Sequence, residues 1–215
     1  MLKTKGLYVG YYDDLNILQN LDVEAPTGKI TAILGANGVG KSTLLKAIYG
    51  FLKPNAGEIW LDDKRVDNIP THELITLGLA YIPQHTGIFK WMTVKENIEL
   101  GGWTFRKDKE RLQQKVEENY ERFPILKEKR NQLAGELSGG QQRMVELSRT
   151  MMTDPTVILV DEPTAGLAKL LSQEVYNMLV GLRDNDGLTI ILVDQEIRSA
   201  LKIADYVYVL DLGRN

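Results

Sequence analysis

Five short runs of apolar residues constrain the fold of this chain more than any other feature of its sequence. Each run has the length of a β-strand, is rich in β-branched residues and lacks polar alternation. Such runs are typical of parallel strands that helices cover on both faces. The pattern therefore predicts an α/β fold built around an open parallel sheet. The runs are Ile30–Leu34, Leu79–Ile82, Val157–Val160, Thr189–Val193 and Tyr206–Leu210.

Two other segments carry a different strand pattern. Leu7–Val23 and Glu58–Val66 each contain two strand-like stretches that a pair of aspartates separates, Asp13–Asp14 in the first and Asp62–Asp63 in the second. Short runs broken by turn-forming residues are typical of antiparallel strands. We therefore expect an antiparallel β region at the edge of the parallel sheet.

A helical pattern separates the second and third of the apolar runs. Leu112, Val116, Tyr120 and Phe123 form one apolar stripe on an otherwise charged helix, expected over Arg106–Phe123. The pattern predicts a helical insertion at about residues 86–136. The remainder, at about 1–85 and 137–215, then forms the core of a single domain that spans residues 1–215.

Composition excludes several classes of protein. The 215 residues are 43% hydrophobic and 26% charged, which is close to the globular average. A net charge of −3, with both signs spread along the chain, offers no basic surface for a nucleic acid. The absence of cysteine excludes a disulfide framework and thiol chemistry. No apolar run approaches the ~20 residues of a membrane-spanning helix, and Met1–Gly6 leads into no secretory signal. We therefore expect a cytoplasmic chain.

A glycine-rich segment after the first strand predicts a phosphate site. Gly35, Ala36, Asn37, Gly38, Val39, Gly40, Lys41 and Ser42 fit the pattern G-x-x-x-x-G-K-[ST] between a strand and a helix expected over Ser42–Leu52. The backbone N–H groups of such a loop surround phosphate oxygens, and the helix N-terminus adds positive charge. Lys41 is expected at the β- and γ-phosphates, Ser42 at Mg²⁺ and Thr43 at the α-phosphate. A glycine-rich turn of purely structural purpose is the alternative.

Polar side chains follow three more of the predicted strands. Asp161 and Glu162 follow Val157–Val160, Gln84 follows Leu79–Ile82, and Gln195 follows Thr189–Val193. Ligands of open α/β sheets bind at this carboxyl edge. We expect Asp161 to hold Mg²⁺, Glu162 to polarise the attacking water, Gln84 to contact Mg²⁺ or that water, and Gln195 to bind the γ-phosphate. Alternatively, the carboxylates cap a solvated turn and the glutamines are ordinary loop residues.

A second glycine cluster introduces a helix expected over Gln142–Met152. Ser138 suits the N-cap of this helix, and Gly139, Gly140 and Gln141 follow it. One bound nucleotide does not need two phosphate loops, so this turn suits a nucleotide held by another chain. With these motifs, about Leu7–Gly213 resembles the ATP-binding cassette (ABC) ATPase family, whose signature reads LSGGQ.

The resemblance implies a fold, cofactors and a partner. The fold is a P-loop NTPase with a RecA-like parallel core, an antiparallel β edge and an inserted α-helical subdomain, and the cofactors are ATP and Mg²⁺. Two cassettes pair head to tail, so that Ser138, Gly139, Gly140 and Gln141 of one contact the ATP of the other. Tyr12 stands where the family stacks an aromatic ring on adenine. Tyr11 could stack on the adenine instead. The other interpretation is that Tyr12 is an ordinary tyrosine at the edge of a strand.

Two positions depart from the common family pattern. Many cassettes have aspartate at the position of Ala168 and histidine at that of Gln195. The chain is instead similar to one branch, the second ATPase subunit of branched-chain amino-acid importers, in which glutamine is usual at the latter position. A glutamine donates a hydrogen bond but carries no titrating proton. Family members usually continue past Asn215, so the sequence resembles a short or truncated version.

The resemblance leads to a functional hypothesis with two alternatives. In the main one, the chain hydrolyses ATP and drives integral membrane permease subunits from the inner face of the membrane, without binding solute itself. Permease contact is expected near His85–Trp91, with Phe89 and Trp91 either as anchors or buried in the helical subdomain. The alternatives are a nucleotide-gated dimerisation clamp with little hydrolysis, and a soluble cassette outside transport.

Overall fold

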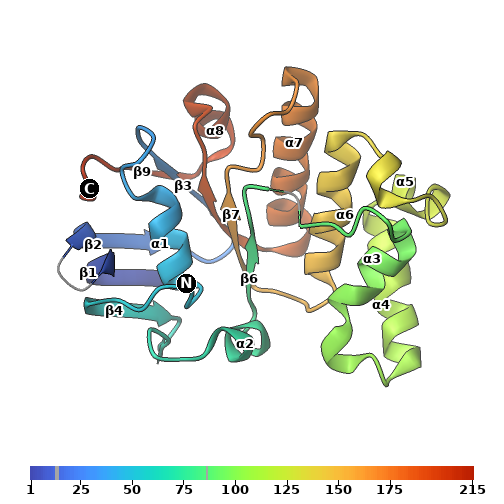
Figure 1. The fold of residues 1–215 in the computed structure, drawn as a ribbon, viewed down its shortest axis with the longest axis horizontal. Helices are drawn as coiled ribbons and strands as arrows, with labels where there is room; N and C mark the ends of the chain where they lie inside the picture. The colour runs from blue at the N-terminus through green and yellow to red at the C-terminus, as the bar shows by residue number, and fades with distance from the viewer. Residues whose placement is uncertain (13–14, 86) are drawn as a thin grey trace.

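A five-stranded parallel sheet forms the centre of the molecule (Figure 1). The computed structural model describes residues 1–12, 15–85 and 87–215, so the Asp13–Asp14 interruption lies outside the described residues. The order of strands in the sheet is β6-β7-β8-β3-β9, and each neighbouring pair is parallel. The α/β prediction is therefore confirmed. The strands are β3 (Ile30–Leu34), β6 (Leu79–Ile82), β7 (Val157–Asp161), β8 (Thr189–Val193) and β9 (Tyr206–Val209).

Alternate residues of the central strands enter two separate apolar cores. Ile33, Leu159 and Ile191 pack toward α1 and the antiparallel strands. Ala32, Ile158 and Ile190 pack on the other face, toward the remaining long helices. Burial on both faces explains the uninterrupted apolar runs. The helices are α1 (Lys41–Ile48), α6 (Gly139–Met151), α7 (Lys169–Asp186) and α8 (Ile197–Ile203), with a short α2 (Thr71–Leu74) before β6.

The strand β9 differs from the prediction. Tyr206, Val207 and Val209 are between 41% and 64% exposed, whereas burial on both faces was expected from the sequence. The reason is position, because β9 lies at the edge of the described sheet and pairs there with β3. An apolar run cannot by itself distinguish a central strand from an edge strand.

The antiparallel edge is confirmed as a four-stranded sheet in the order β2-β1-β4-β5. Leu7 and Val9 of β1 pack with Leu44 and Ile48 of α1 in one core, which fixes this sheet beside the first helix. The strands are β1 (Leu2–Tyr12), β2 (Leu15–Ala25), β4 (Ala56–Leu61) and β5 (Lys64–Arg65).

Helices fill the region between β6 and α6, as the stripe on the sequence predicts. Val116 and Tyr120 of α4, and Phe123 directly after it, are buried against the core that also contains the apolar side chains of α3 and α6. No helix of the described chain is both long and apolar enough to cross a membrane. The helices are α3 (Val94–Gly101), α4 (Lys109–Arg122) and α5 (Pro124–Glu128), with 3₁₀ turns at Trp103–Phe105 and Ala134–Glu136.

Three helix boundaries differ from the sequence prediction by three residues or more. Helix α6 begins at Gly139, not at Gln142, directly after its N-cap Ser138. Helix α4 begins at Lys109, not at Arg106, because the Asp108 side chain accepts a hydrogen bond from the Arg111 N–H at 3.0 Å and caps the helix there. Helix α1 ends at Ile48, not at Leu52, because Gly50 takes a left-handed φ of 76° that stops the helix.

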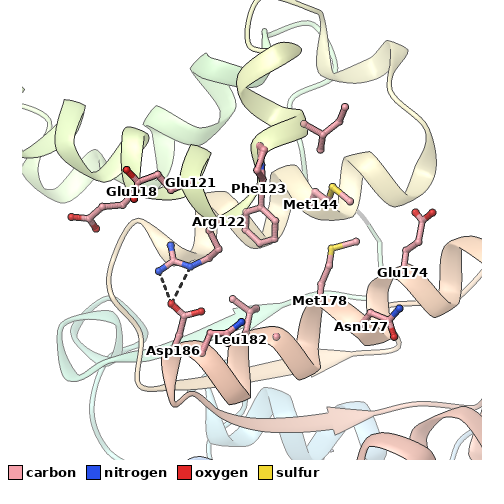
Figure 2. Close-up of a pocket in the computed structure, with 14 residues that line it drawn as sticks. Glu118, Glu121, Arg122, Phe123, Met144, Glu174, Asn177, Met178, Leu182 and Asp186 are labelled. Atoms are coloured by element: carbon pink, nitrogen blue, oxygen red, sulfur yellow. Dashed lines mark hydrogen bonds and ion pairs between the residues drawn. The ribbon is translucent and has the colours of Figure 1, made fainter.

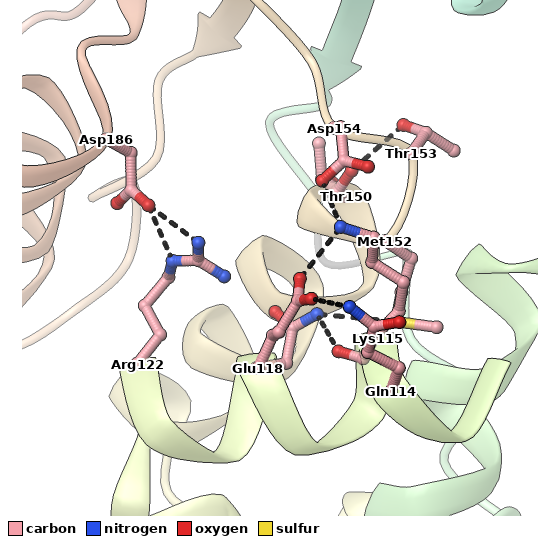
Figure 3. Close-up of polar contacts among 10 residues, drawn as sticks. Gln114, Lys115, Glu118, Arg122, Thr150, Met152, Thr153, Asp154 and Asp186 are labelled. Atoms are coloured by element: carbon pink, nitrogen blue, oxygen red, sulfur yellow. Dashed lines mark hydrogen bonds and ion pairs between the residues drawn. The ribbon is translucent and has the colours of Figure 1, made fainter. Parts of the chain in front are cut away.

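Ion pairs join α4 to its neighbours (Figure 3). Arg122 donates from Nε and Nη2 to Oδ1 of Asp186 in α7, at 3.0 and 2.6 Å. Lys115 bonds Asp154 at 2.8 Å and Glu118 at 2.7 Å. All these groups are partly exposed, so each pair contributes at most about 1 kcal/mol. The buried stripe of α4 therefore provides most of the attachment, and the ion pairs set its orientation.

One buried side chain holds residues 89–93, the part of the loop that leads into α3. Asn97 is fully buried; its Oδ1 accepts from the Phe89 N–H at 2.8 Å, and its Nδ2 donates to the carbonyls of Phe89 and Thr93, each at 2.9 Å. Thr93 and Glu96 form a capping box that starts α3 one turn before it. The Asn97 side chain is the hydrogen-bond partner of the Phe89 N–H, and it adds a second bond to carbonyls that also accept from the N–H groups of Met92 and Asn97.

Replacing Asn97 by alanine is expected to lower the free energy of unfolding by about 3 kcal/mol, because the Phe89 N–H loses its partner and the hydrogen bonds from the amide to the carbonyls of Phe89 and Thr93 are lost. Urea denaturation followed by circular dichroism measures this. The matched control is Asn177→Ala on the exposed side of α7, which should change stability by less than about 0.5 kcal/mol. Equal effects from the two variants would contradict the role given to Asn97.

Candidate functional site

The carboxyl ends of four parallel strands meet at one edge of the sheet. Ile33 of β3 and Asp161 of β7 both pair with Val193 of β8, which places the ends of the three strands at the same level. Strand β6 lies next to β7 and leads into Gln84. The structure therefore brings together the segments that the sequence placed in one crevice.

The glycine-rich loop follows β3 and opens α1, as expected. Gly40 is the N-cap of α1 with φ 105°, and a Cβ there would lie 2.5 Å from Leu18 Cδ2, so only glycine fits. Lys41 is buried and its Nζ donates to the carbonyls of Gly35 and Ala36 at 3.0 and 2.9 Å. Its ammonium thus folds back over the loop. The neutral carbonyls of the loop keep this positive charge inside the loop, where it can attract an anion.

Ser42 and Asp161 form the candidate metal position. Ser42 Oγ donates to Asp161 Oδ1 at 2.8 Å, and the Tyr81 hydroxyl donates to Asp161 Oδ2 at 3.0 Å. Burial and the neighbouring Asp161 carboxylate raise the pKa of Tyr81, which keeps this hydroxyl protonated as a donor. A hydroxyl beside a buried carboxylate suits Mg²⁺, which prefers oxygen ligands.

The chain alone supplies few ligands at that position. Among the described residues, no three His, Cys, Asp or Glu side chains gather into a metal-binding group. Mg²⁺ binds through one or two protein oxygens and completes its octahedral shell with phosphate and water oxygens. The residues present therefore fit Mg²⁺ delivered with a nucleotide, and they do not form a cage for a free ion.

Glu162 lies at the centre of a small polar cluster. Its carboxylate is buried, and Oε2 accepts from Gln84 Nε2 at 2.7 Å and also from Gln195 Nε2. Its backbone has φ 43° and its N–H donates to the Val193 carbonyl at 2.8 Å. A left-handed φ at a non-glycine residue costs of order 1 kcal/mol and is concentrated at functional sites. The structure brings Gln84 and Gln195 to Glu162 rather than to Asp161.

Asp194 was not singled out from the sequence, although it directly precedes Gln195. It is buried and accepts from the Tyr176 hydroxyl at 2.9 Å and from the backbone N–H groups of Gln195 and Glu196 at 2.7 and 2.9 Å. Thr164 Oγ1 lies 3.3 Å from the same carboxylate. Asp194 therefore fixes the backbone from which Gln195 reaches Glu162. The sequence signal that could have pointed to Asp194 is its position directly after a buried strand.

Helix α6 holds the loop that carries Gln84. Arg143 and Glu146 form a buried ion pair at 2.6 Å. Arg143 also donates to the carbonyls of Pro83, at 3.0 Å, and Gln84. Glu146 Oε1 accepts from the Gly87 N–H at 2.8 Å. Sequence reasoning missed this pair, because Arg and Glu three residues apart on a helix usually form an exposed pair.

The second glycine cluster lies away from the phosphate loop. Ser138 accepts from the Gln141 N–H and Gln141 reaches back to Ser138 N, a capping box that confirms the expected N-cap. Ser138 is exposed, Gly139 and Gln141 are half-buried, and Gly140 is buried. In the described chain no hydrogen bond joins this turn to residues 35–42, and α1 and α6 cover opposite faces of the sheet (Figure 1).

Three other predicted positions lie at the margins of the site. Tyr12 is 75% exposed at the end of β1, while the Tyr11 hydroxyl lies 3.4 Å from Lys46 Nζ of α1. Thr43 is buried in the first turn of α1. Ala168 is the N-cap residue of α7 and provides no side-chain cap there. The geometry leaves the choice between Tyr11 and Tyr12 open.

Comparisons with known proteins identify relatives of this chain. Residues 18–165 match the family model described as ABC transporter. The chain is 36% identical over 214 residues to a probable branched-chain amino acid transport ATP-binding protein LivF of Archaeoglobus fulgidus, covering 100% of this chain and 89% of that protein. It is 37% identical over 204 residues to the high-affinity branched-chain amino acid transport ATP-binding protein BraG of Pseudomonas aeruginosa, covering 95% and 86%.

A solved structure extends the likeness to three dimensions. It is the dimeric structure of a post-hydrolysis state of an ATP-binding cassette bound to ADP and Pi. The TM-score is 0.83 and the identity 26%, and the match covers 100% of this chain and 96% of that one.

Removing the carboxylate of Glu146 by substitution with alanine is expected to destabilise the chain by about 3–5 kcal/mol, because the Arg143 charge stays buried without a partner. The double variant Arg143→Met/Glu146→Leu should recover at least about half of that loss, since no buried charge is left. Urea unfolding measures both, with Asp186→Ala at the partly exposed pair as a control worth at most about 1 kcal/mol. A double variant no more stable than Glu146→Ala would sink the argument.

Proposed function

The chain belongs to the ABC transporter family of ATPases, and we propose that it is the ATP-hydrolysing subunit of an importer for branched-chain amino acids. The observation that carries the reaction is the buried Glu162 carboxylate, which two glutamine amides hold beside the Ser42–Asp161 pair. The solute class is supported by the names of the LivF and BraG relatives. The chain powers transport and binds no solute itself.

The phosphate loop binds the nucleotide. Backbone N–H groups of residues 35–42 face the phosphates, Lys41 Nζ moves from the carbonyls of Gly35 and Ala36 to the β- and γ-phosphates, and Thr43 contacts the α-phosphate. Ser42 and Asp161 hold Mg²⁺, and Gln84 offers its amide oxygen to it. When bound, the ion neutralises charge that develops on the phosphate oxygens. An aromatic ring of Tyr12, or of Tyr11, stacks on the adenine.

Glu162 polarises the attacking water. Both amide contacts reach Oε2, and in the described chain Oε1 accepts no hydrogen bond. One oxygen is therefore fixed and the other is available to accept the proton of a water molecule at hydrogen-bond distance. Gln195 donates an N–H to the γ-phosphate once it leaves Glu162. Because its amide does not titrate, Gln195 positions the phosphate and transfers no proton.

The substitution Glu162→Gln is expected to lower ATP turnover at least about 100-fold and to leave ATP affinity within a few fold, because the amide still accepts the two hydrogen bonds but no longer takes a proton. Steady-state phosphate release and nucleotide titration measure the two quantities. Glu196→Gln, an exposed neighbour on the same loop, serves as the matched control and should retain wild-type turnover. Equal, negligible turnover in wild type and Glu162→Gln would favour a nucleotide-gated clamp instead.

A second cassette completes each site. The Ser138–Gln141 turn presents an exposed hydroxyl at a helix N-terminus, distant from the phosphate loop of the same chain. Helix N-termini bind anions, and the related cassette was solved as a dimer with ADP and Pi. We therefore assign Ser138, Gly139, Gly140 and Gln141 to the γ-phosphate held by the partner, in a homodimer or in a heterodimer with a related ATPase.

The partner permease is assigned to the loop after Gln84. Phe89 is 54% exposed and Trp91 is 89% exposed, so neither is buried among the helices. Asn97 and the α3 capping box hold their backbone rigidly. Exposed aromatic side chains on a fixed loop suit a protein interface. Residues 86–136 then act as a helical subdomain that contacts permease subunits at the inner face of the membrane.

Replacing Ser138 by aspartate tests the shared site. Aspartate is also a good N-cap, so α6 should stay folded, but its carboxylate repels the partner's γ-phosphate. We expect at least about a tenfold loss of turnover from Ser138→Asp, and little loss from the control Ser138→Thr. Mixing Ser138→Asp with Lys41→Ala chains should restore activity, since such a pair contains one intact shared site. No restoration in the mixture would contradict the assignment.

A further inference from the structure

Tyr81 reaches the candidate metal position from a neighbouring strand. It lies in β6 and pairs with Leu159 of β7, two residues before Asp161. Side chains alternate along a strand, so Leu159 and Asp161 lie on the same face of the sheet. Tyr81 shares this face, because it packs against the core that contains Leu159. The strand pairing thus brings the Tyr81 hydroxyl within 3.0 Å of Asp161 Oδ2.

The two oxygens of the buried Asp161 carboxylate have different partners. Oδ1 accepts from Ser42 Oγ at 2.8 Å, and Oδ2 accepts from the Tyr81 hydroxyl. Among the described residues, no other group donates to this carboxylate. One oxygen is therefore joined to the phosphate loop, and the other is joined to the neighbouring strand of the sheet.

The ring of Tyr81 is held by two aromatic side chains at the far end of α1. Tyr49 stacks on it with ring centroids 5.4 Å apart and an angle of 26° between the planes. Phe51 meets it edge-on at 5.5 Å and meets Tyr49 at 5.0 Å. Tyr49 is buried as the C-cap residue of α1, whereas Ser42 lies in the first turn of this helix. Helix α1 therefore supports both donors to Asp161, one at each of its ends.

We propose that Tyr81 is a positioning residue that makes the site selective for Mg²⁺ over Ca²⁺. The inference rests on the assignment of Ser42 and Asp161 to the metal ion in the proposed function. Ca²⁺ takes about six to eight oxygen ligands and accepts both oxygens of one carboxylate, whereas Mg²⁺ requires a near-ideal octahedron. Two-oxygen binding of Ca²⁺ to Asp161 would break the hydrogen bond to Tyr81, and the stacked ring keeps that hydroxyl in place. Asp161 thus offers one oxygen to the ion, which suits Mg²⁺.

The test measures binding of the non-hydrolysable ATP analogue AMP-PNP, so that no turnover is needed. Isothermal titration gives its dissociation constant for the full chain with Mg²⁺, with Ca²⁺ and with EDTA. The ratio of the Ca²⁺ constant to the Mg²⁺ constant is the selectivity, and ion binding to the free analogue affects every variant equally. The wild type should bind the analogue more tightly with Mg²⁺. Tyr81→Phe keeps the ring and removes the hydroxyl, and should lower the selectivity at least about fivefold.

Three further variants separate positioning from folding. Tyr49→Phe keeps the stacked ring and should change the selectivity less than about twofold. Tyr49→Leu removes that ring and should lower the selectivity, but it should lower it no further when added to Tyr81→Phe. Phe123→Leu lies in a pocket of about 890 Å³ between α4, α5 and α7, which contains none of the three rings (Figure 2). It should lower the urea midpoint and leave the selectivity within about twofold.

A selectivity of Tyr81→Phe equal to or above that of the wild type would overturn the proposal. So would an equal loss of affinity with both ions, since Tyr81 is then only structural. If either result appears while wild-type binding still depends on Mg²⁺, the assignment of Ser42 and Asp161 stands without a role for Tyr81. Equal wild-type affinity with Mg²⁺ and with EDTA would contradict that assignment and the selectivity together.

Discussion

The common level of the carboxyl ends of β3, β7 and β8 is the constraint on which the rest of the structure depends. Ile33 and Asp161 both pair with Val193, so a serine and an aspartate 119 residues apart come within 2.8 Å. That alignment needs strands buried on both faces, which in turn needs α1 on one side and α6 and α7 on the other. The site exists only once these long-range pairings are complete, and local segments alone cannot form it.

Neutral groups hold the charges at this edge. Lys41 rests on two carbonyls, Asp161 accepts from two hydroxyls, and Glu162 accepts from two amides. Hydrogen bonds from neutral donors lower the cost of burying a carboxylate without neutralising its charge. Two glutamines thus hold the Glu162 carboxylate in place without setting a positive charge beside it.

Features governed by local sequence were predictable, and features governed by tertiary neighbours were not. The loop around Gly40, the cap at Ser138 and the buried strands follow from patterns within a few residues. The exposure of β9 depends on which strands lie beside it. The end of α1 at Ile48 is an exception, because Gly50 is a local signal that the prediction overlooked. The sequence did not reveal the structural roles of four buried residues, because burial changes which partners such side chains bind. These residues are Arg143, Glu146, Asn97 and Asp194. On an exposed surface the same residues would form ordinary caps and ion pairs.

Helix α6 connects the Ser138 turn to the loop that carries Gln84. Its first turn carries Ser138 at the surface assigned to the partner's nucleotide, and its second turn carries Arg143 and Glu146, which bind Pro83, Gln84 and Gly87. Because both partners of this pair are buried, removing either one would leave the other uncompensated. The first turns of α6 and the loop after β6 are therefore joined through one buried ion pair, and this pair fixes the backbone from which Gln84 reaches Glu162.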